Sequence, residues 1–134
     1  MRLRLQFPHG LPAFESHHSF RLESNDHTAP LFDLRSESSE LSFCLLPVAL
    51  LDPGYQLALT DLDRAALLYE PPHELLSLAM LTLGEDSPPT ANLLAPVVID
   101  LATGRAVQTV RGDTRYSHQH PVGVSTTPAE VLCL

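Results

Sequence analysis

Short apolar runs separated by turn-forming residues recur about every ten residues along most of this chain. Several of them alternate apolar and polar side chains, and this period of two is typical of a strand with one buried face. The runs cover residues 2–7, 20–23, 31–36, 41–47, 55–60, 75–83, 92–101 and 105–111. About eight short strands at this spacing predict a mostly β fold, an antiparallel β-barrel or β-sandwich, rather than a parallel α/β sheet.

One segment, residues 61–68, has the composition of a helix instead. Thr60 or Asp61 can accept hydrogen bonds from the free N–H groups of a first helical turn, and Pro71-Pro72 ends the helical pattern. The sequence therefore predicts a single β domain over residues 1–121 with one short helix. The tail over residues 122–134 is expected to be loosely held.

The charge balance restricts the kinds of partner. The chain has a net charge of -8, and all eight of its basic residues are arginines. Proteins that bind nucleic acid or anionic membranes need clustered basic residues, so we expect neither partner for this chain. An acidic protein can instead be steered toward a basic partner. No run of about 18 apolar residues and no signal-peptide pattern is present, so we expect a cytoplasmic protein.

Most motifs that bind cofactors are missing. The sequence has no glycine-rich phosphate loop, no Cys-x-x-Cys and no Gly-x-Ser-x-Gly element, so no cofactor is expected. Its two cysteines, Cys44 and Cys133, are too few for a disulfide framework and are expected to be a buried and a terminal thiol. Arg111-Gly112-Asp113 is expected to form a turn after a strand rather than an adhesion motif.

A metal site remains an alternative. His118-Gln119-His120 could place two imidazoles on one strand face, as in cupin-type β-barrel enzymes, with a third ligand from His9, His17 or His18. That pattern needs a glutamate a few residues later, and Pro121-Val122-Gly123 follows here. Histidines exposed in loops are the competing interpretation. A small metal-dependent β-barrel enzyme is therefore kept only as an alternative function.

The most apolar run, residues 92–101, reads as a strand buried on both faces, with Pro96 indicating an edge or a bulge. Asn92 stands at its entry. This side chain either hydrogen-bonds its own backbone or contacts a partner. Gln108, in the following run, has the same two interpretations. Phe7, Leu45, Leu57, Leu81 and Val98 are predicted core residues.

Several motifs in order resemble the family of flagellar assembly factors called FliW, over roughly residues 5–121. The strongest is Thr90-Ala-Asn-Leu-Leu-Ala-Pro-Val-Val-Ile99. The others are Gly10-Leu-Pro-Ala-Phe14, Phe20-Arg-Leu22, Leu34-Arg-Ser36, the run from Phe43 to Pro47 with Tyr55, Gln108, Tyr116 and His120-Pro121. Each motif is weak alone, and together in this order they are specific.

The chain departs from the family pattern at four positions. Ala13 replaces a glycine, so the elbow around it is predicted to avoid a positive φ there. Arg35 stands for glutamine, Asp100 for asparagine, and Gln119 for arginine. These departures affect the expected details of partner recognition more than the expected fold.

The resemblance implies a protein-binding regulator and not an enzyme. Proteins similar to FliW bind the translational repressor CsrA, which relieves repression of flagellin messenger RNA, and they also bind flagellin. An acidic protein suits a repressor that must be basic where it meets RNA. Each candidate contact could equally be an ordinary solvated residue, and the same fold could serve a non-flagellar partner. The candidates are Asp61, Asp63, Glu70, Glu74, Glu85 and Asp86, with Asn92 and Gln108.

Overall fold

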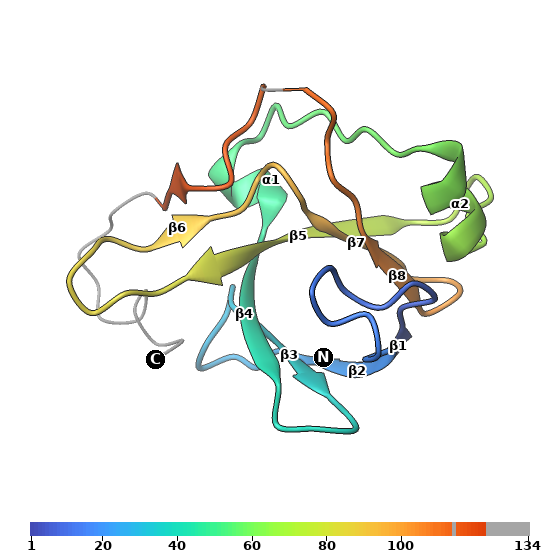
Figure 1. The fold of residues 1–134 in the computed structure, drawn as a ribbon, viewed down its shortest axis with the longest axis horizontal. Helices are drawn as coiled ribbons and strands as arrows, with labels where there is room; N and C mark the ends of the chain where they lie inside the picture. The colour runs from blue at the N-terminus through green and yellow to red at the C-terminus, as the bar shows by residue number, and fades with distance from the viewer. Residues whose placement is uncertain (114, 123–134) are drawn as a thin grey trace.

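The computed structural model describes residues 1–113 and 115–122, which form a closed β-barrel with two short helices (Figure 1). Seven strands follow the order β4-β3-β2-β1-β8-β7-β5, and a pairing between β4 and β5 closes the ring. This architecture confirms the predicted mostly β fold. The strands are β1 Arg2–Gln6, β2 Ser19–Glu23, β3 Phe32–Ser36, β4 Ser42–Pro47, β5 Leu75–Thr82, β6 Thr90–Ala91, β7 Val97–Asp100, β8 Arg105–Gln108 and β9 His120–Pro121; the helices are α1 Val48–Leu51 and α2 Asp61–Leu67.

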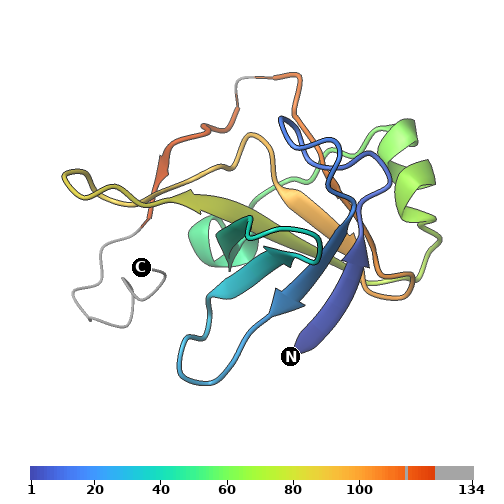
Figure 2. The ribbon, with the colours of Figure 1, turned by 60° about the horizontal axis from the view of Figure 1, so that its bottom comes forward.

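Neighbouring strands of the barrel are antiparallel except at one seam. There β1 runs parallel to β8, and the two strands share a single paired position, Gln6 with Arg105. The strand β5 is long enough to leave the barrel: residues 75–78 pair with β7, residues 78–80 pair with β4, and Leu81 and Thr82 pair with β6. The strand β9 then pairs with β6, so a small three-stranded extension grows out of the barrel wall (Figure 2).

The barrel interior is filled by the apolar side chains that the alternating pattern predicts. In β1 the side chain of Leu5 is buried, whereas Arg4 and Gln6 face solvent. The rings of Phe7 and Phe20 meet edge to face with centroids 5.1 Å apart, a favourable geometry for an aromatic pair. Of the predicted core residues, Phe7, Leu45 and Val98 are fully buried, and Leu57 and Leu81 are half-buried.

Two predicted strands differ most from the structure, and the strand predicted over residues 105–111 ends at Gln108. Residues 55–60 form an extended connection between α1 and α2, in which Leu57 and Leu59 pack on Ala66 and Leu67 of α2. Alternation records which side chains are buried, and an extended connection that rests on the barrel gives the same pattern as a paired strand. The helix α1 was not predicted. Residues 92–101 are also interrupted, because only Val97–Asp100 forms a strand there.

The elbow between β1 and β2 corrects a prediction about Ala13. This residue has a φ of 70°, inside the left-handed region that the sequence analysis expected it to avoid. Gly10 in the same elbow has a φ of 67°, and a Cβ there would lie 2.4 Å from the carbonyl oxygen of Glu15. The elbow therefore keeps the left-handed geometry at position 13 without glycine, at a cost of about 1 kcal/mol.

The prediction for Cys44 is also wrong. The sequence predicts a buried free thiol, but Cys44 is half-buried and disulfide-bonded. The predictions for Cys133 and for the tail beyond residue 122 lie outside the described residues. In the part of the chain that the structure describes, no helix is long and apolar enough to cross a membrane.

Candidate interaction surface

The helix α2 begins with a complete capping box. The hydroxyl of Thr60 accepts a hydrogen bond from the backbone N–H of Asp63 at 3.0 Å, and the Asp63 carboxylate accepts one from the Thr60 N–H at 3.1 Å. The same carboxylate oxygen accepts a 2.7 Å bond from the Thr109 hydroxyl, just after β8. Asp63 therefore fixes both the start of α2 and its position on the barrel.

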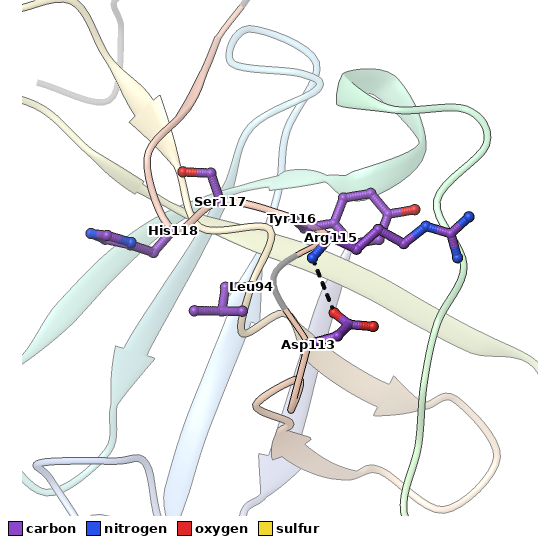
Figure 3. A pocket seen from close by; sticks show the side chains of 6 residues that line it. All are labelled: Leu94, Asp113, Arg115, Tyr116, Ser117 and His118. Atoms are coloured by element: carbon purple, nitrogen blue, oxygen red, sulfur yellow. Dashed lines mark hydrogen bonds between the residues drawn. The ribbon is translucent and has the colours of Figure 1, made fainter.

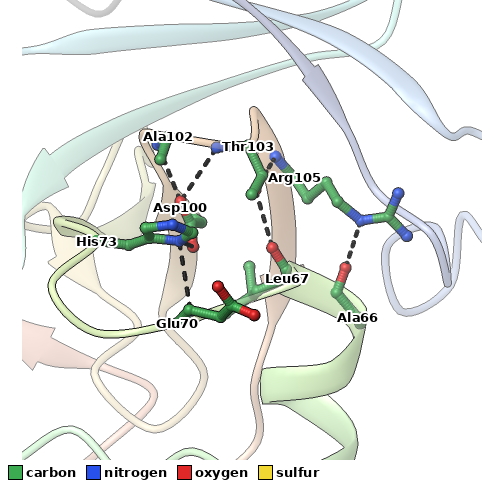
Figure 4. A network of polar contacts seen from close by, with 8 residues as sticks. All are labelled: Ala66, Leu67, Glu70, His73, Asp100, Ala102, Thr103 and Arg105. Atoms are coloured by element: carbon green, nitrogen blue, oxygen red, sulfur yellow. Dashed lines mark hydrogen bonds and ion pairs between the residues drawn. The ribbon is translucent and has the colours of Figure 1, made fainter.

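The other end of α2 is held by side chains from the turn between β7 and β8 (Figure 4). Thr103 donates from its hydroxyl to the Leu67 carbonyl at 2.8 Å, and Arg105 donates from Nε to the Ala66 carbonyl at 2.6 Å. Carbonyl groups in the last turn of a helix lack partners within the helix. A cationic side chain is favourable there because that end of the helix dipole is negative.

That turn is organised by the buried carboxylate of Asp100. Its Oδ1 accepts hydrogen bonds from the backbone N–H groups of Ala102 and Thr103 at 2.9 and 3.1 Å, and its Oδ2 lies 2.9 Å from Nδ1 of His73. An ionised carboxylate only accepts, so the contact with His73 requires the proton on Nδ1. The same nitrogen lies 3.3 Å from the backbone N–H of Glu70, so His73 joins the segment after α2 to the turn that Asp100 organises.

The outer face of α2 and the segment after it carry exposed carboxylates beside exposed apolar side chains. We call Asp61, Glu70 and Glu74, which are all exposed, the acidic edge. Two large apolar residues, Leu62 and Leu68, are 67% and 55% exposed. Apolar side chains surrounded by charged ones are characteristic of the centre and rim of a protein–protein interface.

A pocket of about 250 Å³ lies where α2 and β8 meet the elbow between β1 and β2. It brings together two of the predicted contact residues, Asp63 and Gln108, and adds a carboxylate that the sequence analysis did not select, Glu15. The only sequence signal for Glu15 is its place directly after the Gly10–Phe14 elbow motif. The lining residues are His9, Gly10, Pro12, Glu15, Asp63, Val107 and Gln108.

Asn92 and Gln108 converge on one residue, Ala95, in the corner between β6 and β7. The Asn92 side-chain oxygen accepts from the Ala95 N–H at 3.0 Å, which is the backbone role predicted as one alternative. Gln108 donates to the Ala95 carbonyl, also at 3.0 Å. These two amides hold the corner in the chain, and their contact with a partner stays a prediction.

A buried arginine that the sequence analysis did not select organises the far side of this corner. Arg111 forms two hydrogen bonds with the Asp113 carboxylate, at 3.0 and 2.9 Å, and donates to the Gln56 carbonyl. Its guanidinium lies 5.6 and 4.8 Å from the ring centroids of Tyr55 and Tyr116. The two charged ends of Arg-Gly-Asp are therefore bonded to each other.

These contacts change the ionisation of the cluster. Hydrogen bonding to Asp113 raises the pKa of Arg111 further above its usual value, and the same bonds lower the pKa of Asp113. Burial raises the pKa of the Tyr55 hydroxyl, which donates to the Leu93 carbonyl at 2.7 Å. Neither periodicity nor a motif predicts this cluster, because Tyr55 and Gln56 are distant in sequence from Arg111 and Asp113.

A second pocket, of about 430 Å³, opens beside this cluster (Figure 3). It is lined by Leu94, Asp113, Arg115, Tyr116, Ser117 and His118. His118 therefore lies in this pocket, while His120 belongs to β9 and pairs with Ala91. Within residues 1–113 and 115–122, no three histidine, cysteine or acidic side chains are grouped as metal ligands would be.

Comparison with known proteins relates this chain to one group of relatives. A flagellar assembly factor FliW from Syntrophotalea carbinolica is 32% identical over 117 residues, covering 87% of this chain and 84% of the relative. A second, from Syntrophomonas wolfei, is 29% identical over 128 residues, covering 94% and 82%. A third, from Bacillus subtilis, is 28% identical over 119 residues, covering 87% and 83%.

The fold agrees with the sequence relationship. A crystal structure of the flagellar assembly factor FliW superimposes with a TM-score of 0.82 at 25% identity, covering 92% of this chain and 88% of the other. The model of the FliW protein family matches residues 2–122. With nearly the whole barrel included in that match, this chain belongs to the FliW family of flagellar assembly factors.

Proposed function

We propose that this protein is a cytoplasmic, non-enzymatic regulator that binds a CsrA-type translational repressor through the acidic edge, and that it also binds flagellin. Membership of the FliW family supports the flagellar role. Binding to the repressor would relieve its hold on flagellin messenger RNA. Flagellin would compete for the regulator, so secretion of flagellin would feed back on its synthesis.

The observation that carries the choice of surface is the outer face of α2. Leu62 in the first turn of α2 and Leu68 at its end are both largely exposed, and the side chain of Asp61, which precedes Leu62, is fully exposed. A repressor that binds RNA carries a positive surface, and an acidic rim around an apolar centre complements it. The bonds that Asp63 accepts from the Thr60 N–H and the Thr109 hydroxyl both end at Oδ2, so only its Oδ1 is left for a partner.

Calorimetric titration of the purified protein with a CsrA-type repressor, and separately with flagellin, tests the proposal directly. We expect saturable binding for each protein. An absence of heat beyond dilution for both partners would contradict the proposed function. Recovery of a different protein as the main species bound in native cytoplasm would instead favour a non-flagellar partner.

A matched pair of double variants tests the surface. Asp61→Asn with Glu70→Gln removes two charges from the acidic edge, and Asp26→Asn with Glu40→Gln removes two from exposed positions in loops on either side of β3. We expect the first variant to slow association with the repressor about tenfold at low salt and the second to change it little. Equal slowing by both would show that net charge, and not this surface, governs the encounter.

A further inference from the structure

Three arginines stand side by side on the outer face of the barrel. The register pairs Arg4 of β1 with Arg21 of β2, and Arg21 with Arg35 of β3. Their side chains are 81%, 41% and 54% exposed, and they all lie on the side of the strands opposite the buried leucines. We call these three residues the arginine row; the three strands that carry it lie next to one another in Figure 2.

This arrangement opposes the stability of the sheet. Residues directly opposite each other on antiparallel strands have Cβ atoms about 4.5–5.5 Å apart, and like charges in such positions are destabilising. The barrel does not need these side chains for packing, because its core lies on the other face of the same strands. Residues that lower the stability of the sheet and contribute nothing to its packing are expected at positions that bind a partner.

Neighbouring carboxylates partly neutralise the positive charge of the arginine row. Arg4 bonds Glu37 at 3.0 and 3.3 Å, and Arg35 lies 3.6 Å from Asp33. Arg21 Nε lies 3.0 Å from Glu23, but the nitrogen is buried and is not aligned for a hydrogen bond. A guanidinium has five N–H groups, so each arginine keeps donors free for a ligand.

The row is unusual for this chain. Four of its eight arginines, these three and Arg2, project from β1, β2 and β3 on one face with three carboxylates, so that face is slightly positive on a protein of net charge -8. The row lies on β1, β2 and β3, whereas the acidic edge lies on α2 and the segment that follows it. The feature is therefore independent of the function proposed above.

We propose that the arginine row is a docking surface for an acidic α-helix of a protein partner. Neighbouring strands lie about 4.8 Å apart, and this distance sets the spacing of the backbone positions that carry the three arginines. Residues three and four apart on a helix lie about 5–6 Å apart, so a helix crossing the strands presents carboxylates at a matching interval. Each arginine can bind a carboxylate with two N–H groups.

The surroundings of the row favour such a helix over nucleic acid. Glu23 and Asp33 form the next row on one side, and Glu37 lies on the other. An extended polyanion would bring phosphates over these carboxylates and be repelled. A single line of carboxylates along one helical stripe meets only the arginines.

The experiment uses the full chain and a synthetic helical peptide of alanine and glutamine with glutamates on one stripe. Fluorescence anisotropy measures its binding at low and high salt. A peptide of the same composition, with the glutamates distributed around the helix, is the control ligand, and a single-stranded RNA is the second. We expect the striped peptide to bind at least about threefold more tightly than either control, and less tightly in high salt.

The variants separate binding from folding. Arg35→Gln should weaken the striped peptide about threefold to tenfold, and Arg4→Gln with Arg21→Gln and Arg35→Gln should remove its binding. Arg64→Gln, on the exposed side of α2, is the matched control and should leave it unchanged. Thermal melting should show midpoints close to that of the wild type, because the repulsion that is relieved offsets the exposed ion pairs that are lost.

Several results would overturn the proposal. The row is not a helix-docking surface if the two peptides bind alike, if RNA binds as tightly as the striped peptide, or if Arg64→Gln matches Arg35→Gln. No binding at low salt would overturn it as well. Dimerisation of the wild-type chain that the triple variant abolishes would assign the row to contact with a second copy instead.

Discussion

The buried or bonded carboxylates around α2 and the arginine row are two charged regions of one barrel, and they differ in what their charges do for the fold. Around α2, Asp63 caps the helix and Asp100 holds the turn that anchors its other end. Most polar groups there have a partner inside the protein. In the arginine row, identical charges lie opposite each other, and each arginine is paired only with a carboxylate on the same outer face of the barrel.

This difference distinguishes charged residues that stabilise the fold from charged residues that can contact a partner. A carboxylate such as Asp100 would leave backbone donors unsatisfied if it were removed, so its presence is explained by stability alone. Arg21 lies between two arginines, and its contact with Glu23 is an ion pair at 3.0 Å that satisfies no backbone group. Exposed charges whose removal costs the fold nothing are the ones that we expect to contact partners, and four predictions test this division.

The largest effect is expected at Asp100. Replacing it with alanine removes the buried carboxylate that accepts from the N–H groups of Ala102 and Thr103 and that contacts His73. We expect the free energy of unfolding to fall by about 3 kcal/mol, measured by urea denaturation. Asp100→Asn keeps one acceptor oxygen and should cost roughly 1 kcal/mol. Equal losses for both variants would show that volume rather than hydrogen bonding matters here.

The two carboxylates of the first turn of α2 should differ. Asp63→Ala removes the reciprocal cap and the bond from Thr109, and we expect a loss of about 1–2 kcal/mol in the same assay. Asp61→Ala removes only an exposed ion pair with Arg64, so a change of less than about 0.5 kcal/mol is expected. Similar losses would contradict the assignment of Asp61 to partner binding alone.

The elbow offers a stabilising substitution. Ala13 holds a φ of 70°, which glycine adopts without a steric penalty. We expect Ala13→Gly to raise the free energy of unfolding by about 0.5–1 kcal/mol, because the relief of strain exceeds the added entropy of the unfolded chain. A lower melting temperature would show that the alanine methyl group makes a contact worth more than the strain.

The smallest effect is expected in the arginine row. Arg21→Gln removes the charge that faces two others, and we expect a gain of about 0.2–0.5 kcal/mol at low salt that disappears as salt rises. The measurement is the unfolding midpoint at two ionic strengths. A clear loss of stability would place Arg21 with Asp63 and Asp100 as a structural residue and remove the contrast between the two surfaces.

The sequence predicted the elements whose pattern is local. Alternation located most of the strands, and Thr60 with Pro71-Pro72 bounded α2 closely. It failed at residues 55–60, where Leu57 and Leu59 are half-buried by packing rather than strand pairing. It also treated residues 92–101 as one strand, because an apolar corner held by Asn92 and Gln108 has the composition of a buried strand.

The functional surfaces were predictable only in part. The acids around α2 could be selected from composition and the family resemblance, but sequence could not separate Asp61 from Asp63, whose extra partner is Thr109, 46 positions away. The arginine row depends on the register of three strands, and a shift of one residue would have turned it away. Arg111 was missed because its partners, Gln56 and the two tyrosines, come together only in the fold.

The most direct test of the central claim, that the two surfaces serve different partners, is the association rate with a CsrA-type repressor measured for three proteins. Surface plasmon resonance would compare wild type, Asp61→Asn with Glu70→Gln, and the triple variant of the arginine row. We predict about tenfold slower association for the acidic-edge variant and no slowing for the arginine variant. Slowing of both to the same extent, or of the arginine variant alone, would contradict the account.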